Sequence, residues 1–323
     1  MQIPKYSSLL QSALMICPFF LWGTAMVAMK EATPHTTPFF LASFRLLPAG
    51  ILILLVAAVW KLPQPQTWQA WSWIILFGLV DGTLFQGFLA NGLMRTDAGL
   101  GSVMIDSQPL AVAILSAWLL KESIGLWGGI GLGLGVLGIS CIGLPAEWWQ
   151  QILDPANHDP LQITQLFAHG EWLMLLAALS MAVGTILIRY VTQESDAVVA
   201  TGWHMIIGAV PLILATVFGE ESPWQQLTIL DWSALAYSTV FGSAIAYGLF
   251  FYFAARGNLT SLSSLTFLTP IFALIFGSIF LNESLTAIQF GGVAVTLISI
   301  FLINQREAIS AKFQPQAPEL LPK

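Results

Sequence analysis

Residues 108–123 read QPLAVAILSAWLLKES, and residues 269–284 read TPIFALIFGSIFLNES. Each stretch has a proline at its second position and ends in Glu-Ser, and Pro109 lies 161 positions before Pro270. The same shift matches further residues, pairing Gly23 with Gly184, Trp71 with Trp232 and Arg95 with Arg256. Matches at one fixed spacing along most of a chain indicate an internal repeat. The sequence therefore predicts two copies of one structural unit.

The composition indicates that lipid is the natural solvent of this chain. Of its 323 residues, 56% are hydrophobic and 9% are charged, whereas a soluble domain carries roughly 25% charged residues. The formal charge of -6, without a basic stripe, argues against a nucleic-acid partner. Cys17 and Cys141 lie in apolar runs and give neither a disulfide framework nor a metal-ligand pattern. We expect no metal and no cofactor.

Ten apolar stretches are long enough to cross a bilayer as helices, which takes about 20 residues each. The first is longer than the apolar region of a signal peptide, which has roughly 7–15 residues, so we interpret it as an uncleaved span. The expected spans are Leu9–Met29, Pro38–Trp60, Trp71–Leu93, Ala98–Leu120, Leu126–Leu144, Gly170–Tyr190, Val198–Phe218, Asp231–Phe253, Thr260–Leu281 and Ala287–Ile303.

The distribution of Lys and Arg predicts that both termini are cytoplasmic. With the N-terminus inside, eight of these residues fall in inner segments and only Lys30 and Arg95 in outer ones, which is the bias expected of a membrane protein. The predicted organisation is a first five-helix repeat over 1–145, an outer linker over 146–169, a second five-helix repeat over 170–305 and a disordered cytoplasmic tail over 306–323.

The odd number of spans in each copy determines how the copies are related. Five spans carry the chain from one side of the membrane to the other, so the second copy must cross in the opposite sense to the first. Inverted repeats give two nearly equivalent conformations, each open to one side, which is the physical basis of alternating access. The expected fold class is an all-α membrane protein of ten helices in two inverted repeats.

Three features resemble the EamA-type members of the drug/metabolite transporter superfamily. They are Trp22-Gly23-Thr24 with Lys30 in span one, Phe44-Arg45-Leu46 in span two, and the duplicated segments that contain Pro109 and Pro270. The resemblance covers about residues 9–303 and implies ten helices, cytoplasmic termini and a central cavity lined by spans one, three, four, six, eight and nine. It also implies export of amino acids or other small metabolites. Asp81 and Asp106 are not part of the family pattern.

Asp81 is the first candidate for transport chemistry. It lies about ten residues into span three, or about 15 Å deep at about 1.5 Å per residue, where an ionisable group costs about 2.5–3.5 kcal/mol. One interpretation is a site that binds a proton or a substrate ammonium group. The other is a structural hydrogen-bonding residue beside Gly82 and Thr83.

Arg45 and Asp106 lie at similar depths, roughly 10 and 12 Å from the outer ends of spans two and four. This allows an ion pair, which would act as a gate or as a structural staple. At the equivalent positions of the second copy stand Ile206 for Arg45, Gly242 for Asp81 and Phe267 for Asp106. Any ion chemistry is therefore expected in the first half.

The remaining candidates are prolines, aromatic residues and polar residues within spans. Pro109 and Pro270 each remove a backbone donor, which predicts a bend or hinge beside a cavity in both copies. Glu122 and Glu283 are expected to cap helix ends, and His204 to be packed and neutral. The candidates for the substrate or ion pathway are Asp81, Asp106, Arg45, Trp22, Gln86, Tyr247 and Phe267.

The leading hypothesis is a secondary transporter or facilitator that exports small metabolites, such as amino acids, across the cell inner (plasma) membrane. The alternative is a non-transporting membrane protein, either receptor-like or lipid-modifying. No HExxH, GxSxG or Walker motif is present, which argues against an enzyme and against ATP-driven transport. Proton coupling is compatible with Asp81. A homodimer is compatible with the Gly129–Gly133 spacing in span five.

Overall fold

The computed structural model describes residues 8–95, 104–144, 149, 170–281 and 286–313. Within these ranges the chain is helical and contains no strand. In the first half, the segments are α1 Ser8–Ala32, η1 Thr33–His35, α2 Pro38–Val59, α3 Trp68–Phe77, η2 Gly78–Phe85, α4 Gln86–Leu93, α6 Gln108–Leu119 and α7 Gly125–Gly143. In the second half, they are α9 Glu171–Val191, α10 Ala197–Gly219, α11 Ile229–Tyr237, η4 Ser238–Ile245, α12 Ala246–Ala254, α13 Leu259–Ser264, η5 Leu265–Phe267, α14 Leu268–Leu281 and α15 Ala287–Phe313.

The helices have the length and surface of membrane spans. In the part of the chain that the structure describes, eight are long and apolar enough to cross a bilayer, and the shorter apolar segments Gln108–Leu119 and Leu259–Ala273 stand where spans four and nine are expected. Large apolar side chains such as Val59, Phe218 and Phe301 are well exposed on the outside, as lipid-facing residues are. The protein is therefore a multi-pass membrane protein.

The helix boundaries repeat at the spacing that the sequence predicts. Residues 68–93 form α3, η2 and α4, and residues 229–254, which lie 161 positions later, form α11, η4 and α12. Each of these spans contains a π-helix of eight residues at its centre. π-helical segments are rare and often occur at functional sites. The third span of each half thus carries the same unusual feature at the same place.

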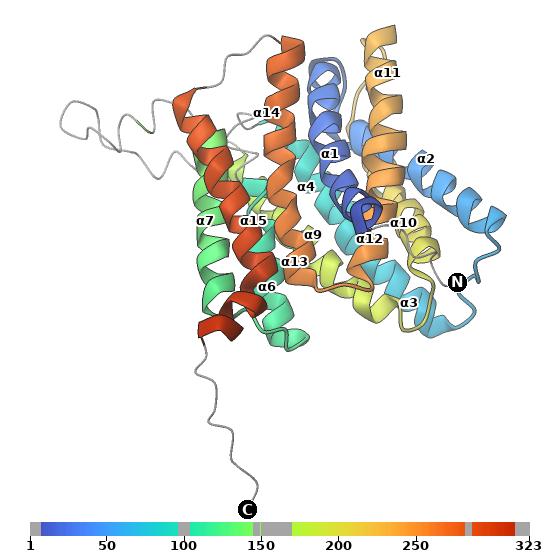
Figure 1. Ribbon diagram of the computed structural model, residues 1–323. Helices are drawn as coiled ribbons and strands as arrows, with labels where there is room; N and C mark the ends of the chain where they lie inside the picture. The colour runs from blue at the N-terminus through green and yellow to red at the C-terminus, as the bar shows by residue number, and fades with distance from the viewer. Residues whose placement is uncertain (1–7, 96–103, 145–148, 150–169, 282–285, 314–323) are drawn as a thin grey trace, which may run out of the picture.

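The two halves are interleaved rather than side by side. The first helix, α1, packs against α14, α11, η4 and α12 of the second half, and its equivalent, α9, packs against α6, η2, α4 and α3 of the first half. In Figure 1, α1 lies between α14 and α11, and α7 lies beside α15. Each half therefore completes the packing of the other, and the hydrophobic core runs through both.

Carboxylates from one half cap helices of the other half. Glu122 accepts hydrogen bonds from the backbone N–H of Leu259 at 3.0 Å and of Thr260 at 3.2 Å, at the start of α13. Glu220 accepts from the N–H of Phe39 at 2.7 Å and of Phe40 at 2.9 Å, at the start of α2. Such caps satisfy free N–H groups and complement the helix dipole. The prediction for Glu122 is confirmed, whereas Glu283 lies outside the described residues.

The prediction of a disordered tail from residue 306 is wrong for residues 306–313, because α15 continues to Phe313. Arg306 is buried and donates to the Ser123 carbonyl at 3.1 Å and to Asn258 Oδ1 at 3.1 Å. This stretch is polar but contains good helix formers, and the first proline after it is Pro315. The contacts of Arg306 to the residues just before α7 and α13 stabilise the additional turns of α15.

Candidate functional site

Two equivalent residues of the two halves meet in the interior. Gln86 Nε2 donates a hydrogen bond of 3.0 Å to the hydroxyl of Tyr247, and the two positions are 161 residues apart. Gln86 follows directly after η2, and Tyr247 is the second residue after η4, so the π-helices position both side chains. Both are at least 97% buried. The bond therefore joins residues at equivalent positions of the two halves.

Buried donors surround this bond. We call Trp22, Arg45, Gln86, Ser243 and Tyr247 the central cluster. The rings of Trp22 and Tyr247 are 5.0 Å apart, and Arg45 donates to the Ser243 hydroxyl at 3.2 Å and interacts electrostatically with Tyr247.

Two N–H groups of the central cluster are without an acceptor in the described part of the chain. Trp22 Nε1 and Arg45 Nε are buried and make no hydrogen bond to any described residue. Buried donors without an acceptor are costly, by about 1–3 kcal/mol each and more when the group is charged. A carboxylate is the kind of acceptor that such buried N–H donors bind most strongly. The central cluster is therefore chemically suited to bind a small anionic or zwitterionic group.

Asp81 contacts His204, which the sequence predicts to be packed and neutral. Its Oδ2 lies 3.3 Å from His204 Nε2, and both side chains are at most 1% exposed. His204 also stacks on Phe77, with 4.1 Å between ring centroids, so the prediction that it is packed is confirmed. Both residues are ionisable and lie in apolar spans, and this shared feature is the sequence signal that points to a pair. Their juxtaposition depends on how α10 crosses η2, which a sequence does not give.

Glycines make room for this pair. A Cβ added to Gly184 on α9 would overlap the carboxylate of Asp81, and one added to Gly82 would lie 2.8 Å from the Cα of Gly208. The backbones of η2 and α10 therefore touch at Gly82 and Gly208, as small residues allow. His204 lies one helical turn before Gly208, and this contact brings it to Asp81.

Phe267 and Asp106 are the two remaining pathway candidates. Phe267 is buried in a separate apolar cluster with Ala113, Leu132, Ile139 and Ile303, where it acts as a packing residue. Asp106 is buried in the turn that precedes α6. The hydrogen bond described for Arg45 goes to Ser243, so the ion pair between Arg45 and Asp106 stays a prediction.

The two prolines mark breaks in their spans, not kinks inside continuous helices. Pro109 is the second residue of α6, after a turn at Asp106 and Ser107, and Pro270 is the third residue of α14, after the 3-10 segment η5. Both are buried. The expectation of a lost hydrogen bond in mid-helix is wrong, because the N–H groups of a first helical turn have no intrahelical acceptor. A role as hinges stays a prediction.

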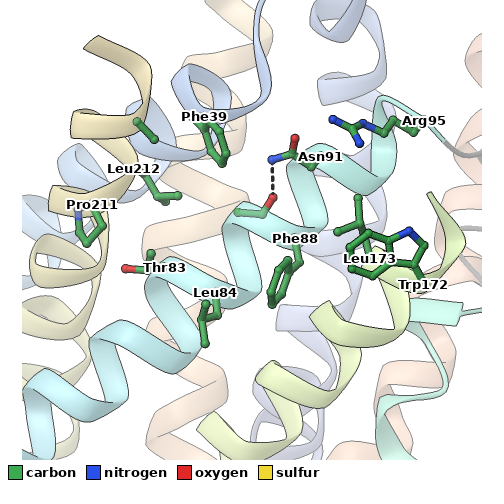
Figure 2. A pocket seen from close by; sticks show the side chains of 12 residues that line it. Phe39, Thr83, Leu84, Phe88, Asn91, Arg95, Trp172, Leu173, Pro211 and Leu212 are labelled. Carbon is green, nitrogen blue, oxygen red and sulfur yellow. Dashed lines mark hydrogen bonds between the residues drawn. The ribbon is translucent and has the colours of Figure 1, made fainter. Parts of the chain in front are cut away.

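A groove of about 350 Å³ runs along η2 and α4, between α9 and α10. Figure 2 shows its side chains from Thr83 near Pro211 and Leu212 to Arg95 near Trp172. Asn91 donates to the Gly87 carbonyl at 2.9 Å within it. Its walls come from spans two, three, six and seven, so it differs from the cavity that the resemblance implies. In the described part of the chain, no group of three or more His, Cys, Asp or Glu is placed to hold a metal.

Comparisons with known proteins show which family this chain resembles. A model of the EamA-like transporter family matches residues 10–144 and 168–305. An uncharacterized transporter of Synechocystis sp. is 62% identical over 93% of this chain and 91% of its own length. A WAT1-related chloroplastic protein of Arabidopsis thaliana is 50% identical over 91% of this chain and 69% of its own.

More distant proteins extend the comparison. A Salmonella typhimurium protein named a probable amino-acid metabolite efflux pump is 22% identical over 87% of this chain and 90% of its own length. A solved structure, titled only as the crystal structure of a protein, superposes with a TM-score of 0.77 at 15% identity over 96% of this chain and 100% of its own, which shows the shared fold. The chain belongs to the EamA-like transporter family.

Proposed function

We propose that this transporter is a secondary exporter of small metabolites, such as amino acids, and works by alternating access between two inverted five-helix repeats. The repeats are residues 1–145 and 170–305, and the membrane is the cell inner membrane with both termini cytoplasmic. The repeated helix boundaries and the two matches to the family model support the two-repeat organisation. The excess of Lys and Arg in inner segments supports the orientation.

The central cluster is the observation that carries the proposal. Trp22 Nε1 and Arg45 Nε are buried donors without an acceptor among the described residues, beside the Gln86–Tyr247 bond that joins equivalent positions. The carboxylate of an amino acid would accept from both donors. A site at the centre of an inverted repeat is equally reachable from either side, which alternating access requires.

The caps at the ends of the molecule suggest what must break when the transporter changes conformation. Glu122 connects the end of span four to α13, and Glu220 connects the end of span seven to α2. Each contact joins one half to the other. In the proposed mechanism, opening on one side releases one of these caps while the opposite cap stays formed.

The test is exchange of radiolabelled amino acids across proteoliposomes that contain the purified protein. We expect exchange above that of empty liposomes for at least one amino acid. Arg45→Gln removes the charged donor and should weaken binding roughly 10- to 150-fold, the equivalent of about 1.5–3 kcal/mol. Arg95→Gln is the matched control, since Arg95 is exposed at the rim of the groove.

Two outcomes would contradict the proposal. One is the absence of exchange for amino acids and related small metabolites in vesicles that contain folded protein, which would favour a receptor-like or lipid-modifying role. The other is exchange that Arg45→Gln leaves unchanged, which would exclude the central cluster as the binding site. Trp22→Phe keeps an aromatic ring at this position and removes the indole N–H, so it repeats the test without altering a charge.

A further inference from the structure

We infer that Asp81 and His204 form a one-proton site that couples transport to a proton gradient, an inference that rests on the proposed function. The two side chains face each other at 3.3 Å between η2 and α10 and are shielded from solvent. Asp81 lies near the middle of its 26-residue span, Trp68–Leu93. Ionisable residues at such depth in a bilayer commonly mark ion and proton pathways.

The hydrogen bonding of His204 determines how many protons the pair holds. Nδ1 lies 2.6 Å from the carbonyl oxygen of Thr201. A carbonyl can only accept, so Nδ1 carries a hydrogen. Nε2, on the other side of the ring, faces Asp81 Oδ2. Attraction between Nε2 and Oδ2 therefore needs one proton between them, either on the imidazole or on the carboxyl group.

The charge of the pair follows from that proton. With it, the pair is neutral overall, as an imidazolium with a carboxylate or as an imidazole with a carboxylic acid. Without it, a carboxylate faces the lone pair of Nε2, and a net negative charge is buried, which is costly. The closely packed arrangement in this structure thus corresponds to the proton-bound pair. Release of the proton requires that the pair separate or become hydrated.

Few other ionisable groups surround the pair. In the described part of the chain, α3 and α4 contribute none, and α9 approaches Asp81 through Gly184. Tyr247 of α12 is close enough to Asp81 and to Arg45 of α2 to interact electrostatically with each. Tyr247 therefore connects the proton site to the central cluster, so the charge of the pair is felt where the substrate would bind.

The second half shows that the helix crossing does not need these charges. The crossing of η2 with α10 is repeated by the crossing of η4 with α2. At the equivalent positions, Gly242 stands for Asp81 and Ser43 stands for His204. Since the equivalent segments η4 and α2 cross with glycine and serine at these two positions, a crossing at this place does not require the Asp81–His204 pair. Burying two ionisable side chains costs desolvation free energy. Proton binding explains why this chain carries them here.

The groove offers a path to the pair from one side. Thr83, at the end of the groove in Figure 2, donates to the Gly208 carbonyl at 2.8 Å, and Gly208 lies one turn from His204. The opposite end of the groove reaches Arg95, which the orientation proposed above places outside. Access of water from the groove to the pair would require the contact between η2 and α10 at Thr83 and Gly208 to loosen.

Infrared spectroscopy of the protein in lipid bilayers tests proton binding without any substrate. We expect a pH-dependent band of the Asp81 side chain, as carboxylic acid or as carboxylate, that is lost in Asp81→Asn and has a displaced midpoint in His204→Gln. The matched control is His35→Gln, because His35 forms a similar pair with Asp231 at 3.1 Å, but with its side chain 44% exposed. That variant should leave the band and its midpoint unchanged.

Flux driven by a pH gradient tests coupling in the same proteoliposomes, with the radiolabelled amino acid that exchanges. Asp81→Asn and His204→Gln should abolish gradient-driven flux and retain exchange of labelled for unlabelled amino acid. A band that persists in Asp81→Asn, or gradient-driven flux that both variants retain, would overturn the inference and leave the proposed function standing. If Asp81→Asn does not fold, His204→Gln alone decides. Loss of all exchange in the wild-type protein would contradict the proposed function instead.

Discussion

The crossing of η2 with α10 and the crossing of η4 with α2 are the same structural element built twice with different chemistry. The first crossing holds Asp81 and His204 in contact. The second holds Gly242 and Ser43 at the equivalent positions, with Arg45 bonded to Ser243 nearby. Apolar and small residues build both crossings, but the contact of Gly82 with Gly208 has no glycine counterpart in the second, where Ser243 and Leu47 stand at the equivalent positions. At these crossings the ionisable residues differ between the halves, so they are where the chemistry of this chain is expected.

Transplanting the charge into the second half should have the largest effect. Gly242→Asp places a carboxylate where Ser43, not histidine, stands opposite, and even a Cβ at residue 242 would overlap Ala25. We expect a loss of stability of at least about 3 kcal/mol, or no folded protein. Thermal unfolding monitored by size-exclusion chromatography measures this.

Gly242→Ala is the matched control for that experiment, because it introduces the overlap without the charge. It should be less destabilising than Gly242→Asp by the cost of the unpaired carboxylate. If Gly242→Asp is as stable as wild type, both crossings tolerate a buried carboxylate. The position of Asp81 in the first half alone would then not indicate a special site.

Changing Gly184 should give the next largest effect. Gly184→Ala directs a methyl group into the carboxylate of Asp81 and should cost about 1–3 kcal/mol, as overpacking typically does. In an Asp81→Gly background, which reproduces the arrangement of the second half, most of that cost should disappear. A double-mutant cycle of unfolding free energies measures the coupling. Additive effects would mean that Gly184 and Asp81 do not share the space that the structure assigns to them.

Removing the bond between the halves should have a smaller effect. Tyr247→Phe leaves the buried amide of Gln86 without its acceptor and should cost about 1–3 kcal/mol. Gln86→Leu combined with Tyr247→Phe replaces both partners by apolar groups and should recover much of that stability. Thermal unfolding of the two variants provides the comparison. Equal destabilisation by the single and double variants would show that the hydroxyl serves another partner.

The caps should give the smallest effects. Glu122→Gln and Glu220→Gln keep the shape of the cap and weaken charge-assisted bonds to α13 and α2, at about 0.5–2 kcal/mol each. Because the caps lie at opposite ends, the two variants should favour opposite conformations. Labelling of single cysteines introduced near each cap would measure this. The same change in accessibility from both variants would argue against alternation between the ends.

Much of the scaffold could be predicted from the sequence, and the reason is physical. Hydropathy determines which stretches lie in lipid, and the predicted span Trp71–Leu93 differs from the observed Trp68–Leu93 by three residues at one end. The spacing of 161 identified equivalent positions before any contact was known. The family resemblance and the internal repeat both rest partly on the same duplicated residues, around Pro109 and Pro270.

The pairing of side chains across helices was less accessible. Depth matching suggested Arg45 with Asp106, whereas Asp81 meets His204 because Gly82 and Gly208 allow two backbones to touch. Neither π-helix has a sequence signal that we recognise. The last turns of α15 were missed because residues 306–313 are polar, and polarity does not distinguish a disordered tail from a helix held by Arg306.

Simultaneous recording of protons and amino acid in one vesicle population tests the account most directly. Proteoliposomes would contain a pH-sensitive dye and a radiolabelled amino acid, and an imposed pH gradient would start the reaction. We expect one proton to move for each amino acid in the wild-type protein, and no proton movement in Asp81→Asn although exchange continues. Identical proton movement in both proteins, or amino-acid flux without protons in the wild type, would contradict it.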